Sequence, residues 1–241
     1  MLRAVLFDLD GTLLPMDTEA FISHYTKTLA PKLSEIVDEK TFLYALWTST
    51  EAMVRSRDAG KTNETVFTET FLPIVEKTKE EIWPALDKFY EEEFPQFASL
   101  TSPVPAAREV IKTTLKAGLK VAVATNPVFP KKAIEHRLDW AGISDLPLDL
   151  ITAYENSSFT KPHPQYYEFI AAELGVNPSE CVMIGNDKQE DMAAAQVGMK
   201  TFLVEGHIID RGEPQFPVSE QGTLEEVIEQ IEKSRGIFQT Y

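Results

Sequence analysis

The sequence of 241 residues predicts an α/β fold, in which a mainly parallel sheet carries helices on both faces. Two observations lead to this prediction. Four short apolar runs are each followed at once by small or polar residues, and continuous apolar runs are typical of strands that are covered on both faces. Helical patterns lie between these runs, and two of them end at a glycine that is followed two residues later by the next run. We therefore expect a Rossmann-like domain of alternating helices and strands.

The order of the elements follows from these runs. Helical patterns end at Gly118 and Gly198, where glycine accepts the left-handed turn that closes a helix. Residues 223–234 (TLEEVIEQIEKS) form an amphipathic pattern and predict a C-terminal helix, whereas residues 206–222 are rich in Gly and Pro and predict irregular surface chain. The expected strands are residues 4–7, 121–124, 182–184 and 201–204, with a weaker candidate within 148–155.

Residues 16–99 differ from the rest of the chain. They hold many apolar and aromatic residues at helical spacing and no convincing strand. We therefore predict that residues 1–15 and 100–241 form the α/β catalytic domain and that residues 16–99 form a helical cap domain inserted after the first strand. The phenylalanines of this insert and all three tryptophans are expected to lie in the core: Trp47, Trp83 and Trp140.

Composition excludes several classes of function. The formal net charge is -15, which argues against a nucleic-acid surface and against adsorption to an anionic membrane. Cys181 is the only cysteine and lies in an apolar run, so we expect it to pack as a small hydrophobic residue. The N-terminal segment reaches charged residues too soon for a signal peptide, and no apolar run approaches the length of a membrane span. We expect a cytoplasmic protein with no nucleic-acid and no membrane partner.

Two carboxylates end the first predicted strand. Asp8 and Asp10 are separated by Leu9, and side chains two residues apart in an extended chain point the same way. Two like charges at the end of a buried strand raise the pKa of at least one of them, unless something compensates. Ligands bind at the carboxyl ends of parallel strands, so a bound group is the expected compensation.

Further polar residues follow the other predicted strands. Asp187 can join Asp8 and Asp10 as an oxygen ligand of Mg²⁺, which uses few carboxylates and accepts a substrate phosphate as a further ligand. Lys161 offers a compact positive charge that offsets a carboxylate and a phosphoryl oxygen. The remaining polar residues expected at this edge are Thr125 and Asn126, as uncharged donors to phosphate, and Asp191.

Four sequence motifs resemble those of the haloacid dehalogenase-like hydrolases. FDLDGTLL resembles the first motif, and VAVATN, which contains Thr125, is similar to the second. TKPHPQYY, with Lys161, resembles the third, and VMIGNDKQEDMAAAQVGM resembles the fourth, in which Asp187 and Asp191 match its two acids. The motifs occur in the family's order, so the resemblance covers the whole predicted sheet domain.

The resemblance implies a role for each matching residue. Asp8 would attack phosphorus, and Asp10 would protonate the leaving oxygen and then activate water. Thr125 would hold the phosphoryl group and Lys161 would balance charge. Asp187 would bind magnesium together with Asp8 and the backbone carbonyl of Asp10. The fourth motif's second acid, Asp191, would orient Lys161 or a metal-bound water.

Three points stay open at this stage. Many family members place the metal-binding acid directly after the glycine, where this chain has Asn186, so the register of one residue is undecided although spacing favours Asp187. His163 is expected to be structural. The predicted cap contains three basic residues that could bind an anionic leaving group, but a solvated face is the simpler interpretation: Arg55, Arg57 and Lys61.

These observations predict a magnesium-dependent phosphatase that hydrolyses a small phosphorylated metabolite through an aspartyl-phosphate. A phosphomutase of the same family retains both acids and is not excluded. A metal-independent haloacid dehalogenase does not retain the second acid, so Asp10 argues against it. A non-catalytic binding protein would not need a nucleophile. The sequence does not decide between a monomer and a homodimer.

Overall fold

A parallel sheet forms the centre of the molecule in the computed structural model, which describes residues 1–239. In this part of the chain the sheet has six strands in the order β3-β2-β1-β4-β5-β6. Every neighbouring pair is parallel, which confirms the predicted fold class. The strands are β1 (Ala4–Phe7), β2 (Lys120–Val123), β3 (Leu150–Ile151), β4 (Cys181–Gly185), β5 (Lys200–Val204) and β6 (Glu220–Gly222).

Helices cover both faces of the sheet, as the continuous apolar strands require. On one face, Val5 and Phe7 pack in a cluster with side chains of α5 (Pro105–Lys116), α6 (Lys131–Trp140) and α8 (Leu224–Lys233). On the other face, Leu6 packs with side chains of α7 (Pro164–Glu173) and of the 3-10 helix η3 (Met192–Val197). Strand β1 lies between β2 and β4, so its carboxyl end is at the centre of the sheet edge.

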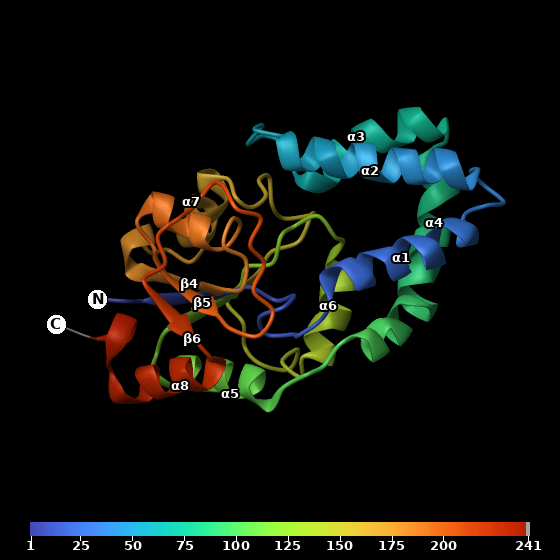
Figure 1. Cartoon of the computed structure of the whole chain (residues 1–241). Coiled ribbons are helices and arrows are strands. Elements are labelled where there is room, and N and C mark those ends of the chain that lie inside the picture. The colour runs from blue at the N-terminus through green and yellow to red at the C-terminus, as the bar shows by residue number, and fades with distance from the viewer. Residues whose placement is uncertain (240–241) are drawn as a thin grey trace.

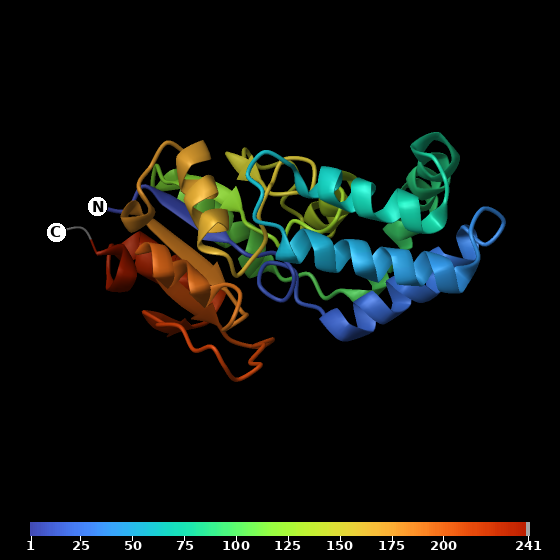
Figure 2. The ribbon, with the colours of Figure 1, turned by 90° about the horizontal axis from the view of Figure 1, so that it is seen from above.

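Helices fill the segment between β1 and α5, as the sequence predicted. They are α1 (Thr18–Lys32), α2 (Glu39–Arg55), α3 (Asn63–Val75), α4 (Lys79–Glu92) and the 3-10 helix η1 (Phe94–Leu100). Figures 1 and 2 show these helices on one side of the molecule and the sheet, with both chain ends, on the other. The chain leaves and rejoins the sheet layer at adjacent points, where the Ser102 N–H donates to the Pro15 carbonyl at 2.9 Å. We propose that this crossing divides the chain into the two predicted domains, residues 1–15 with 100–241 and residues 16–99.

Two predicted elements differ from those in the structure. Residues 206–222 were expected to be irregular, but their last three residues form β6 at the sheet edge. The polar sequence of this short strand gives no apolar run, because an edge strand does not need one. The segment before Gly198 is a 3-10 helix and not an α-helix, which agrees with the preference of 3-10 geometry for short pieces. Two further 3-10 turns are η2 (Pro178–Glu180) and η4 (Gly236–Phe238).

Burial confirms some single-residue predictions and overturns one. Cys181 is fully buried, as expected for a small hydrophobic residue. Trp47 was expected in the core but is 49% exposed. It lies on α2 outside the helical stripe that is buried, which consists of Phe42, Ala45, Leu46, Ser49 and Met53. Over residues 1–239, no helix combines the length and the apolar character that a membrane span needs.

Candidate active site

The predicted site residues meet at the carboxyl end of the sheet. Asp8 directly follows β1, and its N–H donates to the Ile184 carbonyl of β4 at 2.9 Å, so strand pairing continues up to the site. Thr125 follows β2 and Asp187 follows β4. Both line one cavity of about 200 Å³ together with Asp8. Lys161 reaches the same place from the loop before α7.

Lys161 joins two of the carboxylates. Its Nζ donates to Asp8 Oδ1 at 2.7 Å and to Asp191 Oδ1 at 2.6 Å, and its side chain is 1% exposed. Burial alone would lower the pKa of Lys161, but Asp191 and Asp8 together raise it well above its usual value. The lysine is therefore charged, and it neutralises part of the negative charge that the first motif brings together.

Asp191 is held close to the sheet by backbone contacts. Its Oδ2 accepts a hydrogen bond from the Asp187 N–H at 2.9 Å. A Cβ atom on Gly185 would lie 2.1 Å from this same oxygen, so only glycine leaves room for the carboxylate. Burial and the Asp8 charge raise the pKa of Asp191, and Lys161 opposes this rise. The geometry fits the expected position of Asp191 beside Lys161.

Asp10 has a partner that the sequence did not suggest. Arg137 of α6 is buried, and its Nη1 donates to Asp10 Oδ2. Burial raises the pKa of Asp10, as does Asp8, while Arg137 and Lys161 lower it, and the net direction is upward. The other oxygen, Oδ1, is buried and has no hydrogen-bond partner within residues 1–239. The sequence did hold one indication that Arg137 is buried: it lies on the apolar stripe of α6, four residues after Ala133.

Asp187 also pairs with an arginine that was not predicted. Its Oδ2 accepts from Arg211 Nη1 at 2.7 Å, and its Oδ1 accepts from the Gln189 and Glu190 N–H groups at 2.9 Å each. The Arg211 side chain is 52% exposed and comes from the loop between β5 and β6. The loop has no periodic pattern that would mark Arg211 as a site residue. Its position depends instead on backbone hydrogen bonds between the loop and the turn at Asn186.

The three uncharged site residues have different surroundings. Thr125 is buried in the cavity wall, and its carbonyl accepts from the Tyr166 hydroxyl at 2.8 Å. Asn126 also lines the cavity, but its Oδ1 accepts from the Lys161 N–H at 3.3 Å. Asn186 donates through Nδ2 to the His207 carbonyl at 2.6 Å and accepts from the Thr12 hydroxyl at 3.0 Å. Asn186 and Asp187 both line the cavity and both are held by protein contacts, but only Asp187 offers a carboxylate.

Glu190 is a further acid of the cavity that was not predicted. Burial, followed by the charge of Asp187, raises the pKa of Glu190 to about 7. Its Oε2 accepts from Asn126 Nδ2 at 3.2 Å. Glu190 lies next to Asp191 in the fourth motif, and the sequence gives no sign that both neighbours face the cavity.

The charges around the cavity do not balance. When all are ionised, five acidic side chains outnumber three basic ones by two: Asp8, Asp10, Asp187, Glu190 and Asp191 against Arg137, Lys161 and Arg211. The carboxylates of Asp8 and Asp187 line the cavity, and their oxygens are donors of the type that Mg²⁺ prefers. In the described chain, no three Asp, Glu, His or Cys side chains lie close enough to hold a metal ion by themselves. The donor types and the excess charge fit a divalent cation that also uses backbone, water or substrate oxygens.

The basic residues of the helical insert lie away from this cavity. Arg55 pairs with Glu51, and Lys61 pairs with Glu69. Arg57 donates to backbone carbonyls of its own loop. None of the three lines the cavity, so the solvated-face interpretation is the one that fits.

Comparison with known proteins identifies relatives along most of the chain. The family model described as haloacid dehalogenase-like hydrolase matches residues 2–198. An N-acetylmuramic acid 6-phosphate phosphatase of Pseudomonas aeruginosa is 30% identical over 208 residues, which cover 84% of this chain and 81% of the relative. A phosphoglycolate phosphatase of Vibrio vulnificus is 24% identical over 236 residues, or 94% of this chain and 96% of the relative. The crystal structure of a HAD phosphatase from Thermococcus onnurineus has a TM-score of 0.58 at 23% identity, and the match covers 95% of this chain and 97% of that one.

Proposed function

The chain belongs to the haloacid dehalogenase-like hydrolases, and we propose that it is a magnesium-dependent phosphatase that cleaves a phosphomonoester through an aspartyl-phosphate on Asp8. The observation that carries the proposal is the contact of Lys161 with Asp8 in a cavity that also holds Asp10 and Asp187. The names of the two relatives, both phosphatases, support the reaction class. Their substrates differ, so the names do not choose a substrate.

Asp8 has the surroundings of a nucleophile. Lys161 holds Oδ1, while Oδ2 has only a long contact of 3.3 Å with the Thr12 hydroxyl. In the proposed first step, a carboxylate oxygen of Asp8 bonds to phosphorus, and the bond from phosphorus to the leaving oxygen breaks with its electron pair. The positive charge of Lys161 favours the negative charge that gathers on the phosphoryl oxygens.

Asp10 has the surroundings of a general acid and base. Its raised pKa favours the protonated form that the first step needs. Arg137 occupies Oδ2, so we assign the proton to Oδ1. Asp10 gives this proton to the leaving oxygen and then takes a proton from water, whose oxygen attacks phosphorus. This second step releases phosphate and restores the Asp8 carboxylate.

The remaining residues position the phosphoryl group. The side chain of Thr125 and the amide of Asn126 lie in the cavity wall, where they can donate to phosphoryl oxygens. The residues that would hold magnesium are Asp8 and Asp187, through their carboxylates, and Asp10, through its backbone carbonyl. When bound, the ion would neutralise carboxylate and phosphoryl charge at the site. Arg211 is half exposed, so its guanidinium can return to solvent, and the ion would then replace it as the partner of the buried Asp187 carboxylate.

The test is hydrolysis of 4-nitrophenyl phosphate by the purified protein, with magnesium and with a chelator. We expect turnover with magnesium, loss of turnover on chelation and recovery when magnesium is returned. Asp8→Asn should abolish turnover while the protein stays folded. Asp139→Asn is the matched control, because Asp139 is an exposed acid of α6 that does not line the cavity. Absence of turnover on any phosphoester, or full activity of Asp8→Asn, would refute the proposal.

A further inference from the structure

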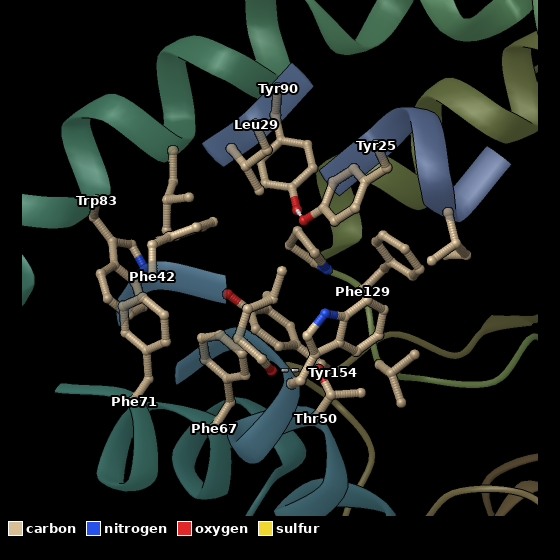
Figure 3. Close-up of a pocket in the computed structure, with 16 residues that line it drawn as sticks. Tyr25, Leu29, Phe42, Thr50, Phe67, Phe71, Trp83, Tyr90, Phe129 and Tyr154 are labelled. Atoms are coloured by element: carbon tan, nitrogen blue, oxygen red, sulfur yellow. Dashed lines mark hydrogen bonds between the residues drawn. The ribbon is translucent and has the colours of Figure 1, made fainter. Parts of the chain in front are cut away.

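A second cavity, of about 190 Å³, lies between the helical insert and the loops that follow β2 and β3 (Figure 3). Helices α1, α2, α3 and α4 all contribute to its wall. Nine of its sixteen lining residues are aromatic, and none of the sixteen is charged. The aromatic residues of the wall are Tyr25, Phe42, Trp47, Phe67, Phe71, Trp83, Tyr90, Phe129 and Tyr154.

This aromatic cavity adjoins the catalytic cavity. Ile22 of α1 and Val128 and Phe129 of the loop after β2 line both. The same loop begins at Thr125 and Asn126, which line the catalytic cavity beside Asp8. A molecule that places a phosphoryl group at Asp8 therefore has only these three side chains between it and the aromatic cavity.

Three of the polar side chains in the wall bond within the protein itself. The hydroxyls of Tyr25 and Tyr90 bond to each other at 2.7 Å, as Figure 3 shows. The Thr50 hydroxyl donates to the Leu46 carbonyl within α2 at 2.8 Å. A charged or strongly polar group that entered this space would lose its hydration without gaining an ionic partner. An apolar group would lose little and would gain contact with aromatic faces.

We propose that this cavity holds an aromatic ring or a compact hydrocarbon group of the substrate's leaving alcohol, an inference that rests on the proposed phosphatase function. The size agrees, because a cavity of about 150 Å³ lined by apolar side chains accepts a benzene ring. The substrate class is then a phosphomonoester with one apolar, ring-sized substituent. With a short acidic leaving group such as glycolate, the aromatic cavity would have no apolar group to bind.

The experiment compares 2-phenylethyl phosphate with ethyl phosphate at saturating magnesium. Both release a primary alcohol, so their chemical reactivities are alike and the ring is the main difference. We expect kcat/KM to be about 10- to 100-fold higher for 2-phenylethyl phosphate, which is the range expected from burying one ring.

A pair of variants tests whether the ring occupies this cavity. Thr50→Phe adds a ring to the cavity wall and should remove most of the preference for 2-phenylethyl phosphate while leaving ethyl phosphate unchanged. Thr70→Phe is the matched control, because Thr70 is also a half-buried helical threonine that bonds to the carbonyl four residues before it, but does not line the cavity. It should keep the full preference.

Binding gives a readout that does not need turnover. Trp47 and Trp83 lie in the cavity wall, so 2-phenylethanol should change the tryptophan fluorescence of Asp8→Asn saturably, and Thr50→Phe should weaken this binding. Equal kcat/KM for both esters, or a preference that Thr50→Phe leaves intact, would overturn the inference while the phosphatase function stands. Failure to hydrolyse either ester or 4-nitrophenyl phosphate would refute the phosphatase function itself. Absence of alcohol binding would overturn the apolar occupant in either case.

Discussion

At the scale of single residues, the buried contacts of Lys161 have the largest energetic consequence. Its ammonium group lies between Asp8 and Asp191, with its side chain 1% exposed. Removing one partner of a buried ion pair leaves an uncompensated charge, which typically costs about 3–5 kcal/mol. Surface pairs contribute about 0–1 kcal/mol.

Lys161→Met should therefore lower the free energy of unfolding by about 3 kcal/mol and abolish phosphatase activity. Urea denaturation and the kinetic assay measure the two effects. Lys188→Met is the control, because Lys188 pairs with Asp210 near the surface, and it should change stability by less than about 1 kcal/mol. A Lys161→Met protein as stable and active as the parent would show that the buried contact has no such role.

Arg137 gives a second prediction at this scale. Its buried guanidinium bonds to Asp10 and lies 4.6 Å from the centre of the Phe129 ring. Arg137→Met should lower kcat about 10- to 100-fold with a smaller change in KM, because Asp10 loses the contact that orients it for proton transfer. Arg137→Lys should recover part of kcat. Arg108→Met, which removes a surface pair with Asp145, should leave both constants unchanged. Equal losses in the Met and Lys variants would indicate a packing role and not a charge-dependent one.

The sequence predicted the residues at strand ends more readily than their partners. Asp8, Thr125 and Asp187 follow apolar runs, so the edge of a parallel sheet brings them together without further information. Arg137 and Arg211 meet their acids only through tertiary structure. Predicting the contact of Arg137 with Asp10 requires knowing which face of α6 is turned towards the site. Predicting the contact of Arg211 with Asp187 requires knowing the path of the loop between β5 and β6.

At the scale of elements, the turn after β1 depends on one glycine. Gly11 has a φ of +89°, and an added Cβ would lie 2.3 Å from Asn186 Nδ2. Gly118 also has a positive φ, of +75°, but an added Cβ there meets nothing within 4 Å. A substitution at either position would therefore strain the backbone, but only a substitution at Gly11 would also create a clash with another side chain.

Gly118→Ala should destabilise the protein by about 1–2 kcal/mol through the left-handed backbone alone and should keep full activity. Gly11→Ala should be less stable than Gly118→Ala and should lose activity, because the turn that carries Asp10 must move away from Asn186. Thermal unfolding and the phosphatase assay compare the two. If Gly11→Ala and Gly118→Ala had similar stability and activity, the clash of the added Cβ at position 11 with Asn186 would have no effect, contrary to this prediction.

The elements that the sequence missed are those without a periodic apolar pattern. Strands β1, β2, β4 and β5 have continuous apolar residues because helices cover both of their faces. Strand β6 is polar and three residues long, so it resembles the loop around it. The cavity between the insert and the sheet was also not predicted, since an aromatic side chain at helical spacing indicates burial but not the empty space beside it.

At the scale of the whole molecule, a few polar contacts join the insert to the sheet domain. The Asn63 and Glu64 N–H groups at the start of α3 donate to the Ser157 and Tyr154 carbonyls at 2.8 Å. At the end of α2, His163 Nε2 donates to the Val54 carbonyl at 2.8 Å, a contact that fits the structural role expected for it. Together with the apolar cluster that spans the insert and the sheet, these contacts hold the insert over the site.

The His163 contact predicts a pH dependence. Burial, and to a lesser degree the charge of Arg57, lowers the pKa of His163 below 6.5, although the bond to Val54 opposes this. The unfolded chain then binds the proton more readily, so this contribution to stability is complete above pH 6.5 and is lost as the pH falls towards the folded pKa. Between pH 7.5 and 5.5, the urea midpoint should fall further for the parent protein than for His163→Gln. An equal fall in both proteins would exclude this residue as a source of the dependence.

Strand β1 also determines when the site can form during synthesis. It precedes both of its neighbours in the sheet, which begin only at Lys120 and Cys181. Until then, the apolar segment from Ala4 to Phe7 has no strand to pair with, while the four helices that follow can already form local contacts. The apolar β1 segment is therefore expected to stay unpaired in the nascent chain until β2 has been synthesised, which delays assembly of the site until long-range pairing is possible.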